Sequence, residues 1–244
     1  MDSFPRKVCR LLCSVLALPL HAMERLGLCG AYKPLFPFLA YNITFSYNDK
    51  MHDTKRELFR NVGRHASLCG SLHLLEIGCG SGANFQFYPY GCTVTCTDPN
   101  PHFERYLRVN MDANAHLSYE QFIVARGEDM AVVKDESVDV VVGTLVLCSV
   151  SSVRQVLREV RRILRKGGAF YFLEHVVSDP SSWTYFLQYV LEPLWYYLGD
   201  GCVITRETWK DLEAAGFSEL HFKHIEAPGV TVVIRPHIMG YAVK

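Results

Sequence analysis

The sequence predicts an α/β fold with a doubly wound, mainly parallel sheet of seven strands, preceded by an N-terminal hydrophobic helix that associates with membranes. Three observations lead to this prediction. From residue 48 onward, short apolar runs alternate with segments of helical period, which is the pattern of strands joined by crossover helices. The first apolar run ends in a glycine-rich turn at residues 78–82. The first thirty residues combine a basic start with a short apolar stretch that the rest of the chain lacks.

The composition is that of a packed globular chain. Of the 244 residues, 49% are hydrophobic and 20% are charged, which excludes a disordered chain, a collagen-like repeat or a coiled coil. Lys and Arg together number 25, as do Asp and Glu, so the chain has no global positive field and we expect no nucleic-acid partner. At this length we expect one large domain, residues 48–244, with an N-terminal membrane-associating segment, residues 1–47.

The N-terminal segment has the features of an interfacial membrane anchor. Its charge-free apolar stretch, residues 11–20, has half the ~20 residues that a bilayer-spanning helix needs. No small-residue cleavage site follows it, which argues against a signal peptide. An aromatic segment at residues 32–45, punctuated by Pro34 and Pro37, suits the headgroup region. We therefore expect membrane association; the alternative is a helix and loop packed on the domain.

Strands and helices are predicted in alternation along the domain. The strands are expected at residues 72–77, 93–97, 119–125, 138–142, 169–176, 219–225 and 238–243. The helices are expected at residues 48–62, 100–114, 153–164, 183–198 and 205–215. Asn100 and Pro101 give the second helix a cap and a favoured first residue. The third is amphipathic, with apolar residues at i, i+3, i+4 and i+7 from Val153.

The nine cysteines form an odd set, with no CxxC pair and no Cys/His cluster at the sequence spacing of zinc sites. We therefore expect reduced thiols, a cytosol-facing compartment and no bound metal. Most of these cysteines lie in apolar stretches, where a free buried cysteine behaves as a small hydrophobic residue.

The turn after the first strand predicts a cofactor site. Residues 74–83, LLEIGCGSGA, have the pattern of a strand, a glycine-rich turn and a helix start, and this pattern fits several adenosine cofactors. Glu76, at the end of the strand, would repel a pyrophosphate resting on that turn. A carboxylate instead suits the ammonium and sulfonium groups of S-adenosylmethionine. We assign to this cofactor the residues Glu76, Gly78, Cys79, Gly80 and Gly82.

Acidic residues after the next two strands extend the predicted cofactor site. Asp98 lies 18 residues after Gly80 and is followed by Pro99, close to the ~20-residue spacing at which an acidic residue binds ribose hydroxyls. The alternative role for Asp98 is a cap or turn residue in Asp-Pro-Asn-Pro. Glu128 and Asp129, after the third strand, offer a carboxylate to the adenine amino group.

These motifs together resemble the series found in the seven-stranded, Rossmann-like class I methyltransferases. The series runs through residues 74–82, Asp98, residues 127–129 and residues 164–168. A narrower resemblance, covering nearly all of residues 48–244, is to the microsomal alkyl thiol methyltransferases, the methyltransferase-like seven proteins. It is carried by long strings at residues 55–59 (KRELF), 82–89 (GANFQFYP), 96–104 (CTDPNPHFE), 144–150 (TLVLCSV) and 235–240 (RPHIMG).

The resemblance implies an enzyme of the endoplasmic reticulum membrane and of lipid droplets, held by an N-terminal hydrophobic anchor with its enzyme domain facing the cytosol. Family members similar to this chain have a longer and cleaner apolar start. Here charged residues interrupt that start, namely Arg6, Lys7, Arg10, Glu24 and Arg25. Lys166 also replaces the Pro that usually precedes the two glycines at residues 167 and 168.

The segment after the fourth strand, residues 143–150, is expected to form the acceptor pocket. It lacks the Asn/Asp-Pro-Pro-aromatic signature of methylases that hold nucleobase amines, and it offers an apolar wall instead. Leu145 is assigned to the cofactor, and Leu147, Cys148 and His175 are assigned to the substrate pocket. His175 and His237 are candidate general bases, although a structural role is the more ordinary one for each. No other catalytic residue is assigned, because transfer of an activated methyl group needs mainly positioning and exclusion of water.

We therefore predict transfer of a methyl group from S-adenosylmethionine to the sulfur of small aliphatic or lipophilic thiols, giving a methyl thioether and S-adenosylhomocysteine. The apolar wall does not distinguish a thiol from a lipid, quinone or hydroxyl acceptor, which is the second interpretation. A third is a cofactor-binding protein whose main role is recruitment to lipid droplets.

Overall fold

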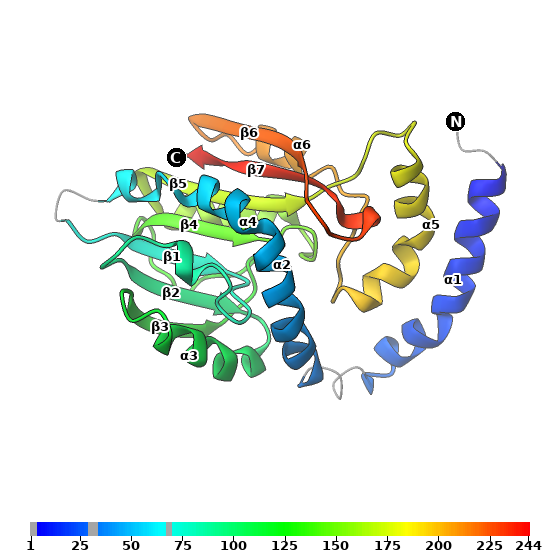
Figure 1. The fold of residues 1–244 in the computed structure, drawn as a ribbon, viewed down its shortest axis with the longest axis horizontal. Coiled ribbons are helices and arrows are strands. Elements are labelled where there is room, and N and C mark those ends of the chain that lie inside the picture. Colours follow the sequence, from blue (N-terminus) through cyan, green and yellow to red (C-terminus); the bar gives the residue numbers. More distant parts are fainter. Residues whose placement is uncertain (1–3, 29–33, 67–69) are drawn as a thin grey trace.

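A computed structural model describes residues 4–28, 34–66 and 70–244 and contains one seven-stranded sheet in the order β3-β2-β1-β4-β5-β7-β6 (Figure 1). β1 to β5 pair in parallel, whereas β7 is antiparallel to both β5 and β6. The predicted doubly wound, mainly parallel sheet is therefore confirmed. The strands are β1 (His73–Ile77), β2 (Thr93–Asp98), β3 (Ser118–Val124), β4 (Val138–Thr144), β5 (Leu164–His175), β6 (Glu219–Glu226) and β7 (Pro236–Val243).

The α-helices of the described residues are α1 (Phe4–Arg25), α2 (Leu35–Phe59), α3 (Glu104–Asp112), α4 (Val153–Ile163), α5 (Trp183–Leu198) and α6 (Thr208–Ala214). α2 and α3 pack on one face of the sheet, and α4 and α6 pack on the other. Alternate residues of β4 separate two cores: Val140 and Val142 pack in the cluster that contains residues of α2 and α3, and Val141 packs with residues of α4 and α6. This alternation follows from the two-residue period of a strand, and burial on both faces explains why the central strands are continuous apolar runs.

The strand order reverses between β1 and β4, because the chain first builds outward through β2 and β3 and then returns to the other side of β1. In open α/β sheets the crevice outside the carboxyl ends of the strands at such a switch point is where ligands bind. The glycine-rich turn follows β1 at this edge, so the topology places the predicted cofactor residues where a ligand is expected.

Short polar side chains cap two helices of the domain; the cap at Asn100 was predicted and the cap at Ser152 was not. Ser152 caps α4, with its hydroxyl accepting a hydrogen bond from the Gln155 backbone N–H at 3.3 Å. Asn100 caps a short 3-10 helix, Pro101–Phe103, that leads into α3. In both places a short polar side chain satisfies a backbone donor that the first helical turn leaves without a partner.

The helix predicted to begin at residue 48 begins instead at Leu35, so the boundary proposed between residues 47 and 48 falls inside α2. Pro34 and Pro37 punctuate the sequence but do not stop the helix, because Pro34 is the N-cap and Pro37 lies in the first turn. A proline is tolerated there, since the N–H groups of the first turn have no helical partner.

The helix start predicted after the glycine turn is wrong. The chain forms turns and a short 3-10 helix, Phe85–Phe87, in place of an α-helix. Tyr88 is extended before Pro89, as expected for a residue that precedes proline. The side chains of Asn84 and Tyr88 both donate to the Glu76 carboxylate at 2.7 Å, and these bonds hold the segment in its compact path.

The N-terminal helix α1 lies beside α5, away from the sheet (Figure 1). The Arg10 guanidinium donates to the Tyr189 carbonyl at 2.7 Å and to Glu192 at 3.0 Å, and Ala17 is buried in the same contact. Apolar side chains of α1 point the other way: Leu11, Leu12, Leu16 and Leu18 are each 57–67% exposed. None of the helices in the described ranges combines the length and apolarity that a bilayer crossing requires.

Replacing the α4 cap in Ser152→Ala should lower the free energy of unfolding by about 1 kcal/mol, because the Gln155 N–H loses its acceptor. Urea unfolding followed by far-ultraviolet circular dichroism, with an unchanged denaturant slope, measures the loss. Ser151→Ala, one residue earlier, should leave the midpoint within error of the parent. Equal midpoints for Ser152→Ala and Ser151→Ala would contradict the capping role.

Candidate active site at the carboxyl edge of the sheet

The glycine turn after β1 has a backbone path that only glycine allows at two of its positions. Gly78 and Gly82 have φ angles of 57° and 79°. A Cβ on Gly82 would lie 2.3 Å from the Phe85 ring, and one on Gly78 would lie 2.6 Å from Val146. The turn is tied to β2 by the Cys79 backbone N–H, which donates to the Thr97 carbonyl at 3.0 Å. The predicted turn residues therefore form one rigid unit with the ends of β1 and β2.

Asp98 lies at the end of β2, directly beside this turn. Its carboxylate accepts hydrogen bonds from the Gly80 N–H at 3.1 Å and the Asn100 N–H at 2.8 Å. Burial raises the pKa of Asp98 to about 6, against the lowering effect of these two amides. The structure thus brings Asp98 and Gly80 together as the spacing predicts, and Pro99 follows as an exposed residue. Binding of the ribose by Asp98 stays a prediction.

Glu76 is buried at the end of β1, only 2% exposed, with its two oxygens held by Asn84 and Tyr88. Burial raises the pKa of Glu76 to about 7, although both hydrogen bonds lower it. The Asn84 side-chain oxygen is also buried and has no hydrogen-bond partner. A partly desolvated carboxylate beside an unused acceptor calls for a cationic donor. The ammonium end of S-adenosylmethionine has this chemistry, so the residues present fit the predicted cofactor.

Lys55 and Asn48 of α2 complete this side of the site, and sequence reasoning did not identify them. The Lys55 ammonium donates to the Asn48 side-chain oxygen at 2.7 Å, and the Asn48 amide donates to the Ala83 carbonyl at 2.7 Å. Burial lowers the pKa of Lys55 to about 8, and the nearby Glu76 charge opposes that change. A sequence signal did exist, because Asn48 and Lys55 share a helical face with the buried Met51.

The acidic pair after β3 contacts backbone N–H groups of the protein. Glu128 accepts hydrogen bonds from the backbone N–H groups of Ser151 and Ser152, at 2.7 and 3.3 Å, and so anchors the start of α4. Asp129 is exposed and accepts from the Ala131 N–H at 3.3 Å. Contact of either carboxylate with adenine stays a prediction, and Glu128 already has a structural role.

The loop after β4 is held from inside the protein. Leu145 adopts a left-handed conformation, φ 58°, which is sparsely populated and often found at ligand sites. Glu174 of β5 accepts hydrogen bonds from the Val146 and Leu147 N–H groups, both at 3.0 Å. Leu147 is 1% exposed and packs in the core on the side of α4. Leu147, predicted to line the substrate pocket, therefore lies in that core.

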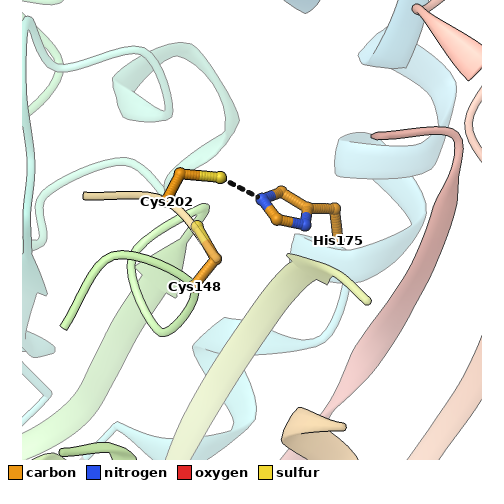
Figure 2. Close-up of side chains that lie close together, drawn as sticks. All are labelled: Cys148, His175 and Cys202. Atoms are coloured by element: carbon orange, nitrogen blue, oxygen red, sulfur yellow. Dashed lines mark hydrogen bonds between the residues drawn. The ribbon is translucent and has the colours of Figure 1, made fainter. Parts of the chain in front are cut away.

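Cys148, His175 and Cys202 meet at the carboxyl ends of β4 and β5 (Figure 2). Their ligating atoms lie within 4.8 Å of one another, and the His175 Nε2 to Cys202 Sγ distance is 2.9 Å. All three residues are buried. The hydrogen bond between the two thiols raises the pKa of Cys148 and lowers that of Cys202. Sequence spacing did not reveal this cluster, because its members lie 27 residues apart along the chain.

His237, the second candidate base, is buried beside this cluster. Its Nε2 lies 3.1 Å from the Tyr47 hydroxyl oxygen, and its Nδ1 lies 3.0 Å from the Arg235 carbonyl oxygen. Burial lowers the pKa of His237 to about 4, so its imidazole is neutral at neutral pH. Both ring nitrogens have partners in the protein, as expected for a histidine with a structural role. The Tyr47 and His237 pair connects α2 to β7.

The comparisons with known proteins agree with this site. A family described as "Methyltransferase domain" matches residues 75–172. Human thiol S-methyltransferase TMT1A is 56% identical over 212 residues, which cover 87% of each chain. Human thiol S-methyltransferase TMT1B is 54% identical over 239 residues, covering 96% of this chain and 97% of the relative.

Solved structures show the same fold at low identity. The trans-methyltransferase CalH in complex with S-adenosylhomocysteine gives a TM-score of 0.56 at 19% identity, covering 84% of this chain and 59% of that chain. A putative methyltransferase from Bacillus halodurans gives a TM-score of 0.55 at 19% identity, covering 76% and 98%. The chain is an S-adenosylmethionine-dependent class I methyltransferase and belongs to the thiol S-methyltransferase family.

Proposed function

We propose that this chain transfers a methyl group from S-adenosylmethionine to the sulfur of small aliphatic or lipophilic thiols, at a membrane or lipid-droplet surface that faces the cytosol. The two human relatives that share more than half of their aligned residues with this chain are named thiol S-methyltransferases. The observation that carries the acceptor class is the composition of the β4–β5 side of the site, where Cys148 and Cys202 are buried beside the imidazoles of His175 and His237. The one neighbouring carboxylate, Glu174, accepts through one oxygen from the backbone of the loop after β4.

The cofactor and the acceptor have separate places along the carboxyl edge. Glu76 and Asn84 hold the ammonium end beside β1, and Asp98 holds the ribose beside β2. The acceptor then approaches from the other side of β1, where the loop after β4 and the end of β5 form the wall. In this arrangement the residues of both sides would position the acceptor sulfur toward the methyl group and exclude water, which are the two main contributions a protein makes to this reaction.

Methyl transfer at this site needs little further catalysis. S-adenosylmethionine supplies a methyl group that is already activated by its positive sulfur. A small thiol has a pKa near ~8.5, so a few per cent is thiolate at neutral pH. The thiolate lone pair forms the new sulfur–carbon bond, and the electron pair of the broken bond stays on the cofactor sulfur. A buried imidazole that accepts the thiol proton would add a modest factor.

The outward face of α1 and the start of α2 support the membrane part of the proposal. Leu11, Leu12 and Leu16 of α1 are at least 60% exposed, while Arg10 is turned inward to α5. Phe38 and Ile43 of α2 are also exposed, at 51% and 68%. A helix whose leucines are exposed while Arg10 pairs with α5 presents an apolar face outward, which suits the acyl boundary of a lipid surface. The family resemblance implies that the protein is located at the endoplasmic reticulum and lipid droplets.

A lipid or hydroxyl acceptor is the competing proposal, and recruitment without catalysis is the third. Transfer of labelled methyl from S-adenosylmethionine to a panel of small thiols, phenols and lipids separates them. Labelled thioether as the main product supports the thiol acceptor. Labelled ether or lipid would replace it with the second proposal, and cofactor binding with no labelled product would favour recruitment.

In the same assay Asp98→Ala should raise the dissociation constant of S-adenosylmethionine by roughly 10- to 100-fold, because each lost hydrogen bond to a charged group costs about 1.5–3 kcal/mol. Calorimetric titration of the cofactor measures this change directly. Asp53→Ala removes the same group from an exposed position on α2 and should bind as the parent does. Unchanged affinity in Asp98→Ala would exclude the ribose role.

The affinity for S-adenosylmethionine should fall as pH falls through about 7. The cofactor cation binds the ionised form of Glu76, and protonation of a carboxyl with a pKa of about 7 removes that form at lower pH. The limiting loss is roughly tenfold per pH unit. From pH about 8 to about 6.5 the ionised fraction of such a carboxyl falls from about 0.9 to about 0.25, so titrations over this range should show an affinity loss of about fourfold in the parent and in Glu57→Gln, an exposed control. Glu76→Gln should bind more weakly at the upper pH and lack the slope; parallel profiles for parent and Glu76→Gln would contradict the assignment.

Leu12→Asp combined with Leu16→Asp should weaken co-sedimentation with phospholipid vesicles by more than about tenfold, because each buried leucine contributes roughly 1.5–3 kcal/mol. Cofactor affinity should be unchanged, since both residues lie on α1. The control Val109→Asp changes a residue of α3 that is 57% exposed and should leave sedimentation unaffected. Equal vesicle binding by the α1 variant and the parent would exclude this face as the membrane contact.

A further inference from the structure

Cys148, His175 and Cys202 form a buried cluster of three side chains that could ligate a metal ion. The residues are 2%, 3% and 6% exposed, and they come from the loop after β4, the end of β5 and the segment after α5. His175 Nδ1 is buried and has no hydrogen-bond partner. Figure 2 shows that the other ring nitrogen, Nε2, is the one that faces the thiols, whereas Nδ1 lies on the far side of the ring.

The backbone around the cluster is fixed by several independent bonds. The Val203 N–H donates to the Cys148 carbonyl at 3.0 Å, which places Cys202 beside Cys148. The guanidinium of Arg206, which follows Cys202 along the chain, donates to the Leu147 and Val150 carbonyls. These bonds hold the same loop from the segment after α5. Donors and acceptors on both sides of Cys148 therefore hold its sulfur in place before any ligand arrives.

The sulfur of Cys202 has a further polar partner. The Trp195 indole N–H donates to Cys202 Sγ at 3.2 Å. An N–H group directed at sulfur stabilises the thiolate, and hydrogen bonds of this kind accompany thiolate ligands in metal sites.

The separations suit tetrahedral coordination. With zinc–sulfur bonds of about 2.3 Å and a zinc–nitrogen bond of about 2.0–2.1 Å, two thiolates and an imidazole nitrogen lie about 3.5–3.8 Å apart. In the structure every pair of ligating atoms is within 4.8 Å, and His175 Nε2 and Cys202 Sγ are 2.9 Å apart. Shifts of about 1 Å or less at side-chain ends bring these distances to the coordinated values.

We propose that Cys148, His175 and Cys202 bind a Zn²⁺ ion, and that its fourth coordination position takes the sulfur of the acceptor thiol. Two thiolates, one imidazole and a thiophilic cation are a matched donor set, whereas Mg²⁺ and Ca²⁺ require oxygen ligands. Binding releases the two cysteine protons to solvent, and the resulting unit is electrically neutral. Burial favours such a neutral unit, and the charge that a coordinated acceptor thiolate would add is opposed by the positive sulfur of the cofactor. Three protein ligands with one open position is the arrangement of catalytic zinc sites.

The second half of the proposal rests on the proposed thiol methylation. The cluster lies at the ends of β4 and β5, on the side of β1 opposite to Asp98, and this is the side left for the acceptor. A thiol that binds zinc gives up its proton to solvent and becomes a coordinated thiolate. Its lone pair then forms the bond to the methyl carbon while the cofactor sulfur keeps the electrons of the broken bond. The product thioether is neutral and a weaker ligand, so the position is freed.

The first test is the metal content of the full-length protein, purified without chelators and measured by inductively coupled plasma mass spectrometry. We expect close to one equivalent of zinc in the parent and in Cys92→Ala, which removes an equally buried thiol outside the cluster. Cys148→Ala and Cys202→Ala should bind zinc at least about 100-fold more weakly, since even an outer partner of a ligand contributes about 10–100-fold. Retained binding of S-adenosylhomocysteine shows that each variant is folded.

Cobalt substitution tests the geometry and the open position. Co²⁺ in the parent should give sulfur-to-cobalt charge-transfer absorption and tetrahedral bands in the visible region, and addition of a small alkyl thiol without S-adenosylmethionine should shift those bands. A parent that contains no zinc and gives no such spectrum overturns the site. So does equal zinc in the parent and both folded cysteine variants, which marks the metal as adventitious.

The two proposals can fail separately. Cobalt bands that do not respond to thiol, in a protein that holds zinc through Cys148 and Cys202, overturn acceptor binding at the metal. Bands that respond to thiol in a protein that methylates only lipids or hydroxyls would support the metal site and overturn the thiol acceptor as the physiological function. Active methylation of thiols by metal-free protein at the rate of the zinc form would overturn the catalytic use of the site.

Discussion

The buried carboxylate of Glu76 is the interaction on which the active edge depends. It stands at the end of β1, and the donors that satisfy it, Asn84 and Tyr88, belong to the segment that returns from the glycine turn. Because a buried acid without donors would be costly, these bonds fix both the residue and the path of the chain after it. Lys55 and Asn48 then connect α2 to the same turn. Fold and cofactor site are thus stabilised by one polar network, in which the Asn84 oxygen remains an unused acceptor.

The strands were predictable from the sequence because their signal is local. β1 and β4 are short apolar runs buried on both faces, and α4 has an apolar face at helical spacing, so each could be recognised without knowledge of its neighbours. The glycine turn and Asp98 were found for a related reason, since both belong to one β-turn-β stretch with a characteristic spacing. What the sequence did not show depends on distant contacts. Nothing between residues 83 and 88 indicates that Asn84 and Tyr88 bind back to Glu76, and a helix was expected there instead.

The cysteine and histidine cluster illustrates the same limit more strongly. A zinc motif is recognised in sequence when its ligands are close along the chain. Cys148, His175 and Cys202 are instead far apart along the chain. They come together because β4 and β5 are neighbours in the sheet and because the chain after α5 folds back over the ends of these strands. The start of α2 was missed for a different reason. Prolines usually mark boundaries, but at the cap and in the first turn they are compatible with a helix, and the aromatic residues after them have no clear period.

α2 joins the outer part of the molecule to its chemistry in a single piece. Phe38 and Ile43 are exposed near its start, and Tyr47 and Asn48 contact His237 and the glycine turn further along. At a rise of about 1.5 Å per residue, Phe38 and Asn48 are separated by about 15 Å along the helix. A continuous helix keeps this separation constant, so a lipid layer in contact with Phe38 would stand at a set height from the site of transfer. Acceptors that partition into that layer would then reach the enzyme at their concentration in lipid, and the apparent KM would follow their partition coefficients and the amount of lipid present.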